Sequence, residues 1–263
     1  MPDRSPFDLL AETYDETFTS SQIGQLQRKR VWEYLLPLAS ENNLSILEIN
    51  CGTGEDALRL ASMGHKVIAT DASEAMIEKA KTKKGADAVD FKVCSFADLE
   101  SMTPNEQFDL ILSNFGGLNC IDQPEMIRLK NTLHSHLKPD GKLILVLMGR
   151  CCLWEITHYG KKGKFKKAFR RFHRSATFSI GQQVMPVFYY SPKSLKNIFE
   201  PELKSIARHP IGLFIPPSYL EDRFDRKADA LSKLYKREQK FDSPVWANYA
   251  DHYCMIFENN RPS

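Results

Sequence analysis

Short apolar runs alternate with helix-patterned segments over the first 150 residues of the chain. In the intervening segments apolar residues recur every three or four positions, as in Met126, Leu129, Leu133 and Leu137. Such an alternation predicts an open α/β sheet whose strands run mostly parallel. The runs that predict its first five strands are Ser45–Ile49, Lys66–Asp71, Asp90–Cys94, Phe108–Ser113 and Leu143–Met148.

The pattern changes after residue 150. Leu203–Ile211 and Tyr253–Glu258 predict a sixth and a seventh strand, and the segments at about 150–191 and 212–250 are insertions. The insertions leave the sheet near the ends of the fourth and fifth strands, where an open α/β sheet binds its ligands. No linker, repeat or low-complexity tract sets them apart. We therefore expect a single domain over residues 1–263, with the insertions forming a cap.

The first insertion carries the strongest charge bias of the chain. Residues 161–174 hold eight Lys and Arg residues and no acid, with three phenylalanines spaced to share one face. This pattern predicts an amphipathic basic helix. In the second insertion, the run from Ser218 to Glu221 predicts a capping box that starts a helix. Paired strands are predicted at Ser175–Ile180 and Gln183–Tyr190.

Composition narrows the function classes only slightly. Hydrophobic residues make up 42% of the chain and charged residues 26%, as in ordinary globular proteins, and a net charge of +3 does not demand a nucleic-acid partner. The six cysteines form no CxxC pair, so we expect reduced thiols and a cytoplasmic protein; a disulfide between Cys151 and Cys152 is the rarer alternative. We expect no metal site, no signal peptide and no transmembrane helix.

The clearest ligand-binding pattern follows the first strand. The run ILEINCGTGED, from Ile46 to Asp56, joins a strand that contains Glu48 to a helix through a turn with Gly52 and Gly54. The two glycines let the backbone approach a ligand closely, and the helix directs its first amides toward that ligand. From residue 52 the spacing GxGxxA also matches the dinucleotide fingerprint weakly, which leaves NAD as an alternative ligand at this point.

With Glu48 included, the run resembles the first motif of class I S-adenosylmethionine-dependent methyltransferases, an acid followed by a turn of the form GCGTG. Asn50 stands where that family usually has its first glycine, and asparagine tolerates left-handed backbone. A carboxylate suits a donor that carries an ammonium and a sulfonium, and it would repel a pyrophosphate. The LKPDG sequence at 137–141 and the loop that begins at Asn114 resemble further motifs of the family, which dinucleotide enzymes do not usually show. We therefore identify the chain as a member of this family, of the small-molecule type.

The resemblance implies a Rossmann-like methyltransferase fold, with a doubly wound, mostly parallel seven-stranded sheet, and S-adenosyl-L-methionine as the cofactor. Asp71, at the tip of the second strand, would accept hydrogen bonds from the ribose; the alternative is a cap for the next helix. Tyr14 would close over the methionine end of the donor and Arg28 would meet its carboxylate. The alternatives are a packed aromatic residue and a solvated cation.

The remaining parts of the donor are assigned by the same resemblance. Ala72 and Met76 would border the adenine, Ser95 and the backbone at Phe96 would read it, and the loop backbone at Asn114 and Phe115 would hold the methionine part. The predicted cofactor-binding residues are therefore Tyr14, Arg28, Glu48, Asn50, Gly52, Gly54, Asp71, Ala72, Met76, Ser95, Phe96, Asn114 and Phe115.

Methyl transfer needs alignment and exclusion of water, and it needs a general base only when the acceptor is a hydroxyl. His158 and Tyr159 are the candidate catalytic residues, and the sequence assigns the role of base to neither. Aromatic residues throughout the insertions favour a small acceptor with an aromatic or extended apolar part. A first alternative is a substrate bound to RNA or to an acidic carrier protein that docks on the basic 161–174 helix. A second is a protein that binds the donor without catalysis.

Overall fold

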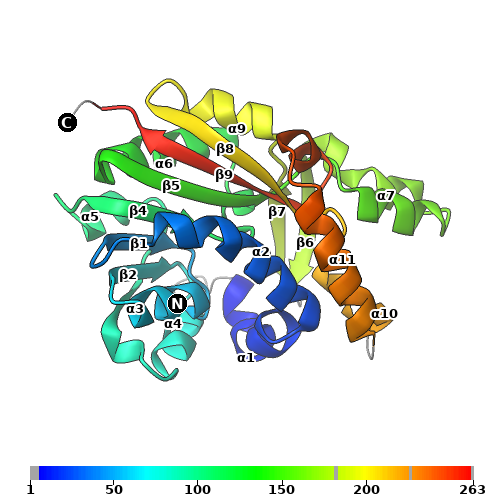
Figure 1. Ribbon diagram of the computed structural model, residues 1–263, viewed down its shortest axis with the longest axis horizontal. Helices are drawn as coiled ribbons and strands as arrows, with labels where there is room; N and C mark the ends of the chain where they lie inside the picture. The colour runs from blue at the N-terminus through cyan, green and yellow to red at the C-terminus, as the bar shows by residue number, and fades with distance from the viewer. Residues whose placement is uncertain (1–5, 181–182, 225–226, 262–263) are drawn as a thin grey trace.

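The computed structural model describes residues 6–180, 183–224 and 227–261. Seven strands form one sheet (Figure 1). Six of them run in the same direction, and β9, which lies next to the edge strand β8, runs antiparallel to both of its neighbours. The predicted doubly wound, mostly parallel sheet is thereby confirmed. The spatial order is β3 (Val89–Val93), β2 (Lys66–Asp71), β1 (Ser45–Ile49), β4 (Phe108–Ser113), β5 (Leu137–Met148), β9 (His252–Asn259) and β8 (Leu203–Ile211).

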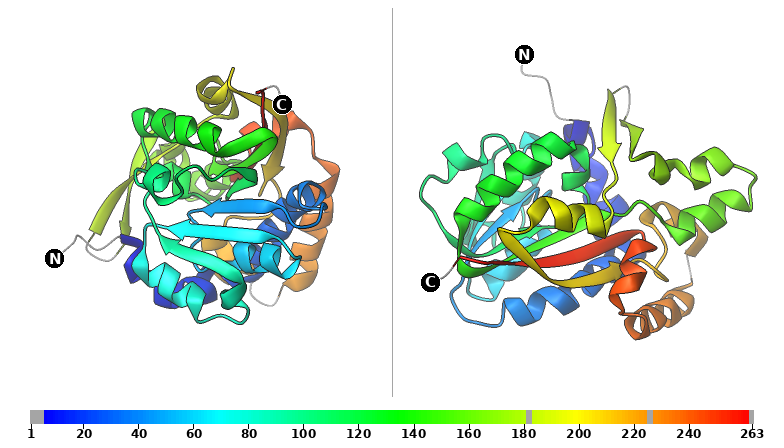
Figure 2. Two further views of the ribbon diagram at one scale, coloured as in Figure 1. Left: turned by 90° about the vertical axis from the view of Figure 1, so that its left-hand side faces the viewer. Right: turned by 90° about the horizontal axis from the view of Figure 1, so that it is seen from above.

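Alternate residues of the central strands enter two separate hydrophobic cores. In β5, Ile144 and Val146 face one core, whereas Leu143, Leu145 and Leu147 face the other. Both faces are buried, so the strand is apolar throughout instead of alternating. Two layers of helices cover these faces (Figure 2). The first core packs under α2 (Gln22–Leu38), α3 (Glu55–Ser62) and α4 (Glu74–Lys81), and the second under α5 (Leu99–Met102), α6 (Gln123–His136) and α9 (Pro192–Phe199).

The first insertion does not contain the continuous basic helix that was predicted over residues 161–174. The chain instead leaves α7 through a turn in which Gly163 has a φ of +68°, and it leaves helical geometry again at Phe169. This break turns Arg170 and Arg171 inward, where both bind the buried Glu155. The elements are α7 (Leu153–Gly160), α8 (Phe165–Ala168), η5 (Arg170–His173) and the hairpin strands β6 (Ser175–Ile180) and β7 (Gln183–Phe188), which confirm the predicted pair of strands.

The second insertion corrects the predicted capping box. Ser218 makes no side-chain cap; Glu221 instead accepts hydrogen bonds from the backbone amides of Gln22 and Ile23, at 2.8 and 3.0 Å, and so caps the N-terminus of α2. This contact tethers the insertion to a helix almost 200 residues earlier in the chain. The elements of the insertion are η6 (Ser218–Leu220), α10 (Glu221–Phe224), α11 (Ala228–Lys240) and η7 (Pro244–Asn248).

Short helical turns precede α2 and lie beside the first insertion. The hairpin β6–β7 stands away from the main sheet and lies against η1 (Pro6–Leu9), as both views of Figure 2 show. The chain then continues through α1 (Ala11–Tyr14) and η2 (Asp15–Thr19) into α2. All six cysteines are free thiols. Within the ranges that the structure describes, no helix has the length and apolar character to cross a membrane.

Candidate functional site

A cavity lies at the carboxyl ends of β1 and β4, beneath the N-terminal turns. It draws together three of the predicted segments: the N-terminal Tyr14 with Arg28 of α2, the turn after β1, and the loop after β4. This is the edge at which a parallel sheet binds its ligand. The lining residues are Tyr14, Arg28, Glu48, Asn50, Cys51, Gly52, Thr53, Glu55, Asp56, Asn114 and Phe115.

The two glycines of the turn do different work. Gly52 has a φ of +54°, and a Cβ there would point toward the ring of Tyr14 at 3.7 Å, so this glycine faces the cavity. Gly54 has a φ of +77°, and a Cβ there would lie 2.7 Å from the ring of Phe91. Close packing of α3 on the sheet therefore requires Gly54, whereas only Gly52 of this pair leaves room for a ligand.

Asn50, the departure from the family pattern, joins the turn to the loop after β4. Its φ is +49°, its side chain donates to the carbonyl of Asn114 at 2.9 Å, and its Oδ1 accepts from Ser113 Oγ at 2.6 Å. A Cβ on Gly117 would lie 2.5 Å from Asn50 Cγ. The glycine at 117 thus makes space for the side chain of Asn50.

Buried charges of both signs surround the cavity. Arg28 forms an ion pair with Asp56, which also accepts hydrogen bonds from Asn114 and Trp32 at 2.8 and 2.7 Å. Burial opposes the ionisation of Asp56, but Arg28 and these hydrogen bonds outweigh it and hold the pKa of Asp56 below its usual value. Glu48 lacks an ion-pair partner among the described residues, and burial, reinforced by the nearby Asp56, raises its pKa well above the usual value.

Three buried polar atoms of this cluster have no hydrogen-bond partner among the residues that the structure describes. They are Glu48 Oε2, Asn114 Oδ1 and Arg28 Nε. Two oxygens that accept and one nitrogen that donates fit a ligand with an ammonium and a carboxylate, which is the chemistry of an amino-acid group. The residues present therefore fit the methionine part of the predicted donor.

Tyr14 is held over the turn by its neighbour. Asp15 Oδ1 accepts from Thr53 Oγ1 at 2.6 Å and from Lys83 Nζ at 3.1 Å, which ties the N-terminal segment to the Gly-containing turn and to the residues after α4. Burial raises the pKa of Tyr14 to about 12, so its phenol stays protonated and can act as a hydrogen-bond donor near neutral pH.

The residues predicted at the ribose and adenine lie next to this cavity but outside its lining. Asp71 Oδ2 accepts from the amide of Gly52 at 2.8 Å, and Oδ1 accepts from the amide of Ser73 at 2.9 Å. Ser73 caps α4, as its sequence position suggested, so Asp71 is not needed for that role. The ends of β2 and β3 are adjacent, which sets Asp71 and Ala72 beside the segment with Ser95 and Phe96, while Met76 is buried on α4. Their roles toward the donor stay predictions.

The structure does not bring His158 and Tyr159 to the cavity. Both lie on α7, where His158 Nδ1 is 2.8 Å from Arg223 and the ring of Tyr159 stacks on Tyr219, with centroids 6.2 Å apart. Burial, together with the positive charge of Lys162 and Arg223, lowers the pKa of His158. These two residues thus join the first insertion to the second.

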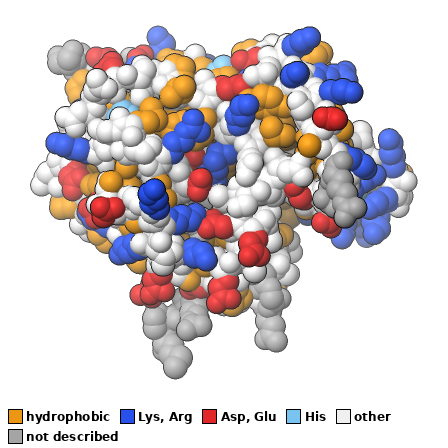
Figure 3. All heavy atoms as spheres, turned by 60° about the horizontal axis from the view of Figure 1, so that its bottom comes forward, with side chains coloured by type: hydrophobic (Ala, Val, Ile, Leu, Met, Phe, Trp, Pro, Cys, Tyr) orange, Lys and Arg blue, Asp and Glu red, His pale blue; other side chains and the backbone are white. Residues whose placement is uncertain are grey.

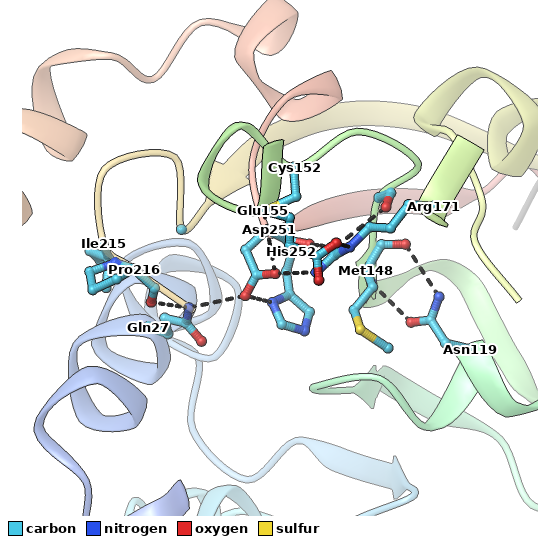
Figure 4. Close-up of polar contacts among 12 residues, drawn as sticks. Gln27, Asn119, Met148, Cys152, Glu155, Arg171, Ile215, Pro216, Asp251 and His252 are labelled. Atoms are coloured by element: carbon cyan, nitrogen blue, oxygen red, sulfur yellow. Dashed lines mark hydrogen bonds and ion pairs between the residues drawn. The ribbon is translucent and has the colours of Figure 1, made fainter. Parts of the chain in front are cut away.

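Sequence reasoning missed a polar network at the start of β9. Asp251 and His252 have no motif around them, and only the fold sets them beside Arg171 and Gln27, as Figure 4 shows. Asp251 Oδ1 accepts from Arg171 Nη2 at 2.6 Å, and Oδ2 lies 3.2 Å from His252 Nδ1. Nothing local in the chain signals these contacts, because Arg171 and Asp251 are 80 residues apart.

The chain resembles known proteins in sequence and in structure. A family model for a methyltransferase domain matches residues 46–141. A malonyl-[acyl-carrier protein] O-methyltransferase of Bacillus anthracis is 30% identical over 74% of this chain and 67% of its own length. The chain belongs to the S-adenosylmethionine-dependent methyltransferases of class I. S-adenosyl-L-methionine is accordingly the cofactor of this methyltransferase.

Other relatives of this methyltransferase differ in their acceptors. A demethylmenaquinone methyltransferase of Clavibacter sepedonicus is 31% identical, over 53% of this chain and 55% of its own. A tRNA 5-carboxymethoxyuridine methyltransferase of Escherichia coli (strain K12) is 32% identical, over 56% and 57%. The chain thus spans between about half and two thirds of the length of these curated relatives. The solved structure of the CcbJ methyltransferase from Streptomyces caelestis shares the fold, with a TM-score of 0.66 at 14% identity over 99% of this chain and all of that one.

Proposed function

We propose that this methyltransferase transfers the methyl group of S-adenosyl-L-methionine to a small molecule with an aromatic or extended apolar part. The observation that carries the proposal is a row of apolar side chains beside the donor cavity. The ring of Phe115, which lines the cavity, lies 5.1 Å from that of Phe18 and 5.6 Å from that of His252. Phe18 comes from the N-terminal turn η2 and Phe115 from the loop after β4, so the row lies where these segments meet at the cavity, which suits a compact acceptor.

In this proposal the donor supplies a methyl group that its sulfonium already activates. Glu48 binds the ammonium and Arg28 the carboxylate of its methionine part, while Tyr14 closes over it and Asp71 binds the ribose. These contacts would hold the donor in one orientation, and the rings of Phe18 and Phe115 would keep water away from the methyl group that it supplies. We further propose that residues 1–263 act as a single domain with a cap formed by the insertions. The free thiols support a cytoplasmic location.

A second candidate is an acceptor carried by an acidic protein. The basic segment, defined as residues 161–174, keeps five lysines exposed, and Phe165, Phe169 and Phe172 are 63%, 44% and 47% exposed. Lysine and arginine side chains gather at this end of the molecule (Figure 3). Exposed cations around apolar rings fit an acidic partner with an apolar patch. The Bacillus anthracis relative is named for such a substrate.

Calorimetry with S-adenosylmethionine, S-adenosylhomocysteine and NAD tests the donor assignment. We expect both adenosyl ligands to bind and NAD not to bind; binding of NAD alone would overturn the donor assignment.

Transfer of label from the donor tests the acceptor class. It is measured to a metabolite extract, to acylated carrier protein and to bulk tRNA, each at low and high salt. We expect product in the metabolite fraction. Labelled tRNA with steeply salt-dependent binding would contradict the small-molecule proposal, and product on carrier protein alone would favour the second candidate. Donor binding with no product in any fraction would indicate a non-catalytic protein.

A further inference from the structure

His252 is the one histidine whose imidazole adjoins the apolar row beside the donor cavity within the described residues. It begins β9, pairs in register with Met148 at the carboxyl end of β5, and packs edge-on against Phe115. The side chain remains 12% exposed. In Figure 4 the imidazole and the thioether of Met148 extend to the same side of Asp251, and a dashed line joins the imidazole to Asp251.

Asp251 faces this imidazole at one nitrogen. Its Oδ2 lies 3.2 Å from Nδ1, an ion-pair contact without hydrogen-bond geometry, and Nε2 makes no hydrogen bond within the part of the chain that the structure describes. A carboxylate at Nδ1 favours the tautomer with the proton on that nitrogen. The lone pair is then on Nε2, the nitrogen free to meet a ligand.

The position of Asp251 is fixed from several elements at once. Its other oxygen accepts from Arg171 Nη2 at 2.6 Å, its carbonyl accepts from Arg171 Nη1 at 2.7 Å, and Gln27 of α2 donates to Oδ2 at 3.4 Å. Gln27 is in turn held by the carbonyl of Pro216 at 3.0 Å. A carboxylate that two side chains from different elements hold, Arg171 and Gln27, is a rigid support for an imidazole.

We propose that His252 is the general base of this methyltransferase and that its acceptor is a hydroxyl compound, with Asp251 as a positioning residue. This inference rests on the function proposed above and names the acceptor class and the base for that same site. The acceptor oxygen forms its new bond to the donor's methyl carbon while the carbon–sulfur bond breaks toward sulfur. The hydroxyl proton passes to Nε2 of His252, and Asp251 stabilises the resulting imidazolium.

Other titratable groups near this place suit the role less well. Burial raises the pKa of Tyr14 and that of Cys120 to about 12, so both stay protonated near neutral pH. Burial also raises the pKa of the Cys152 thiol. The charges that face His252 are Asp251 directly, Arg171 and Glu155 behind Asp251, and Arg28 on the opposite side of the Phe115 ring.

The sequence provides a matched control pair for the test. His209, on β8, also lies beside an acid, with its Nδ1 3.0 Å from Asp242 Oδ1. Its ring, however, stacks on Tyr34 of α2 and not on Phe115. His252→Asn keeps a side-chain N–H for Asp251 and removes the base, and His209→Asn makes the same change outside the site. Labelled donor is supplied with phenolic and aliphatic hydroxyl compounds and, separately, with carboxylic acids.

For the hydroxyl acceptor of the wild-type protein, we expect His252→Asn to lower kcat by about 100-fold or more, while calorimetric affinity for S-adenosylhomocysteine changes less than twofold. His209→Asn should match the wild type. Equal rates in His252→Asn and wild type, or methylation of carboxylic acids alone, would overturn the inference.

Nitrogen-15 NMR of the imidazoles in the S-adenosylhomocysteine complex tests the same inference without an acceptor. We expect His252 to carry its proton on Nδ1 and to lose that preference in Asp251→Asn. A proton on Nε2 in the wild type would overturn the proposal. The two failures are distinguishable, since a wrong proposed function leaves the wild type without labelled product, whereas a wrong base leaves His252→Asn as active as the wild type.

Discussion

The donor cavity and the two insertions are held together by contacts of different range. At the cavity, Glu48, Asn50 and Gly52 come from the end of β1 and the turn after it, and their partners come from the ends of neighbouring strands of one sheet. In the insertions, Arg171 binds an acid 80 residues later, and Gln27 reaches the same acid across 224 residues. A turn carries its chemistry in consecutive residues, whereas a cap becomes a binding surface only when distant segments meet.

The largest expected effect concerns Arg171, which joins distant segments of the chain. It is 4% exposed and binds both Glu155 and Asp251, which are themselves almost fully buried. Arg171→Ala leaves the buried Asp251 without its guanidinium and the buried Glu155 with Arg170 alone, so we expect the free energy of unfolding to fall by about 3–5 kcal/mol. Urea unfolding measures this loss.

The exposed Arg174 is the matched control, and Arg174→Ala should change stability by no more than about 0.5 kcal/mol. Where Arg171→Ala is still folded, its affinity for S-adenosylhomocysteine should change far less than its stability. A parallel loss of affinity would mean that the donor cavity depends on the insertions after all.

Glu48 tests the local side of the comparison. Its pKa is raised well above the usual value in the protein alone, and an ammonium from the donor would favour its charged form. Binding should therefore release a proton at any pH at which Glu48 is protonated in the free protein, and affinity should rise with pH until Glu48 is fully ionised. We expect Glu48→Gln to abolish the proton release and to weaken binding by about 1.5–3 kcal/mol.

Calorimetry in two buffers of different ionisation enthalpy measures the released proton. Glu74→Gln, an exposed change in the first turn of α4, should behave as the wild type. Equal proton release in Glu48→Gln and wild type would remove Glu48 from the ammonium site.

Of the three substitutions at Arg171, Glu48 and Asp71, the one at Asp71 should cause the smallest loss of free energy. Asp71→Ala removes a charged hydrogen-bond acceptor for the ribose, and we expect donor binding to weaken by about 1–3 kcal/mol. Asp90, exposed on the neighbouring β3, is the control for a change of charge alone. If Asp71→Ala and Asp90→Ala both bind S-adenosylhomocysteine like the wild type, Asp71 serves only to support the turn through Gly52 and Ser73.

The sheet and the donor turn could be predicted because their signals are local. An apolar run on both faces of a parallel strand, an acid at its end and glycines in the next turn all lie within about a dozen residues. The prediction of a continuous basic helix was wrong because buried ion pairs outweigh the periodic pattern of the sequence. Residues 161–174 have helical spacing of aromatic and basic residues, yet Glu155 draws Arg170 and Arg171 inward and breaks the helix.

The sequence alone determined the succession of strands in the doubly wound sheet, the place of its ligand edge and the family to which the chain belongs. Only the tertiary structure decided the spatial order of the strands, that Gly54 serves packing and Gly52 the ligand, that Glu221 caps a helix at the other end of the chain, and that His252 packs against Phe115 of the donor cavity while His158 lies elsewhere. Periodicity reports which face of an element is apolar. Which charges are buried together, and which imidazole an acid orients, follows from packing between segments that are far apart in the chain.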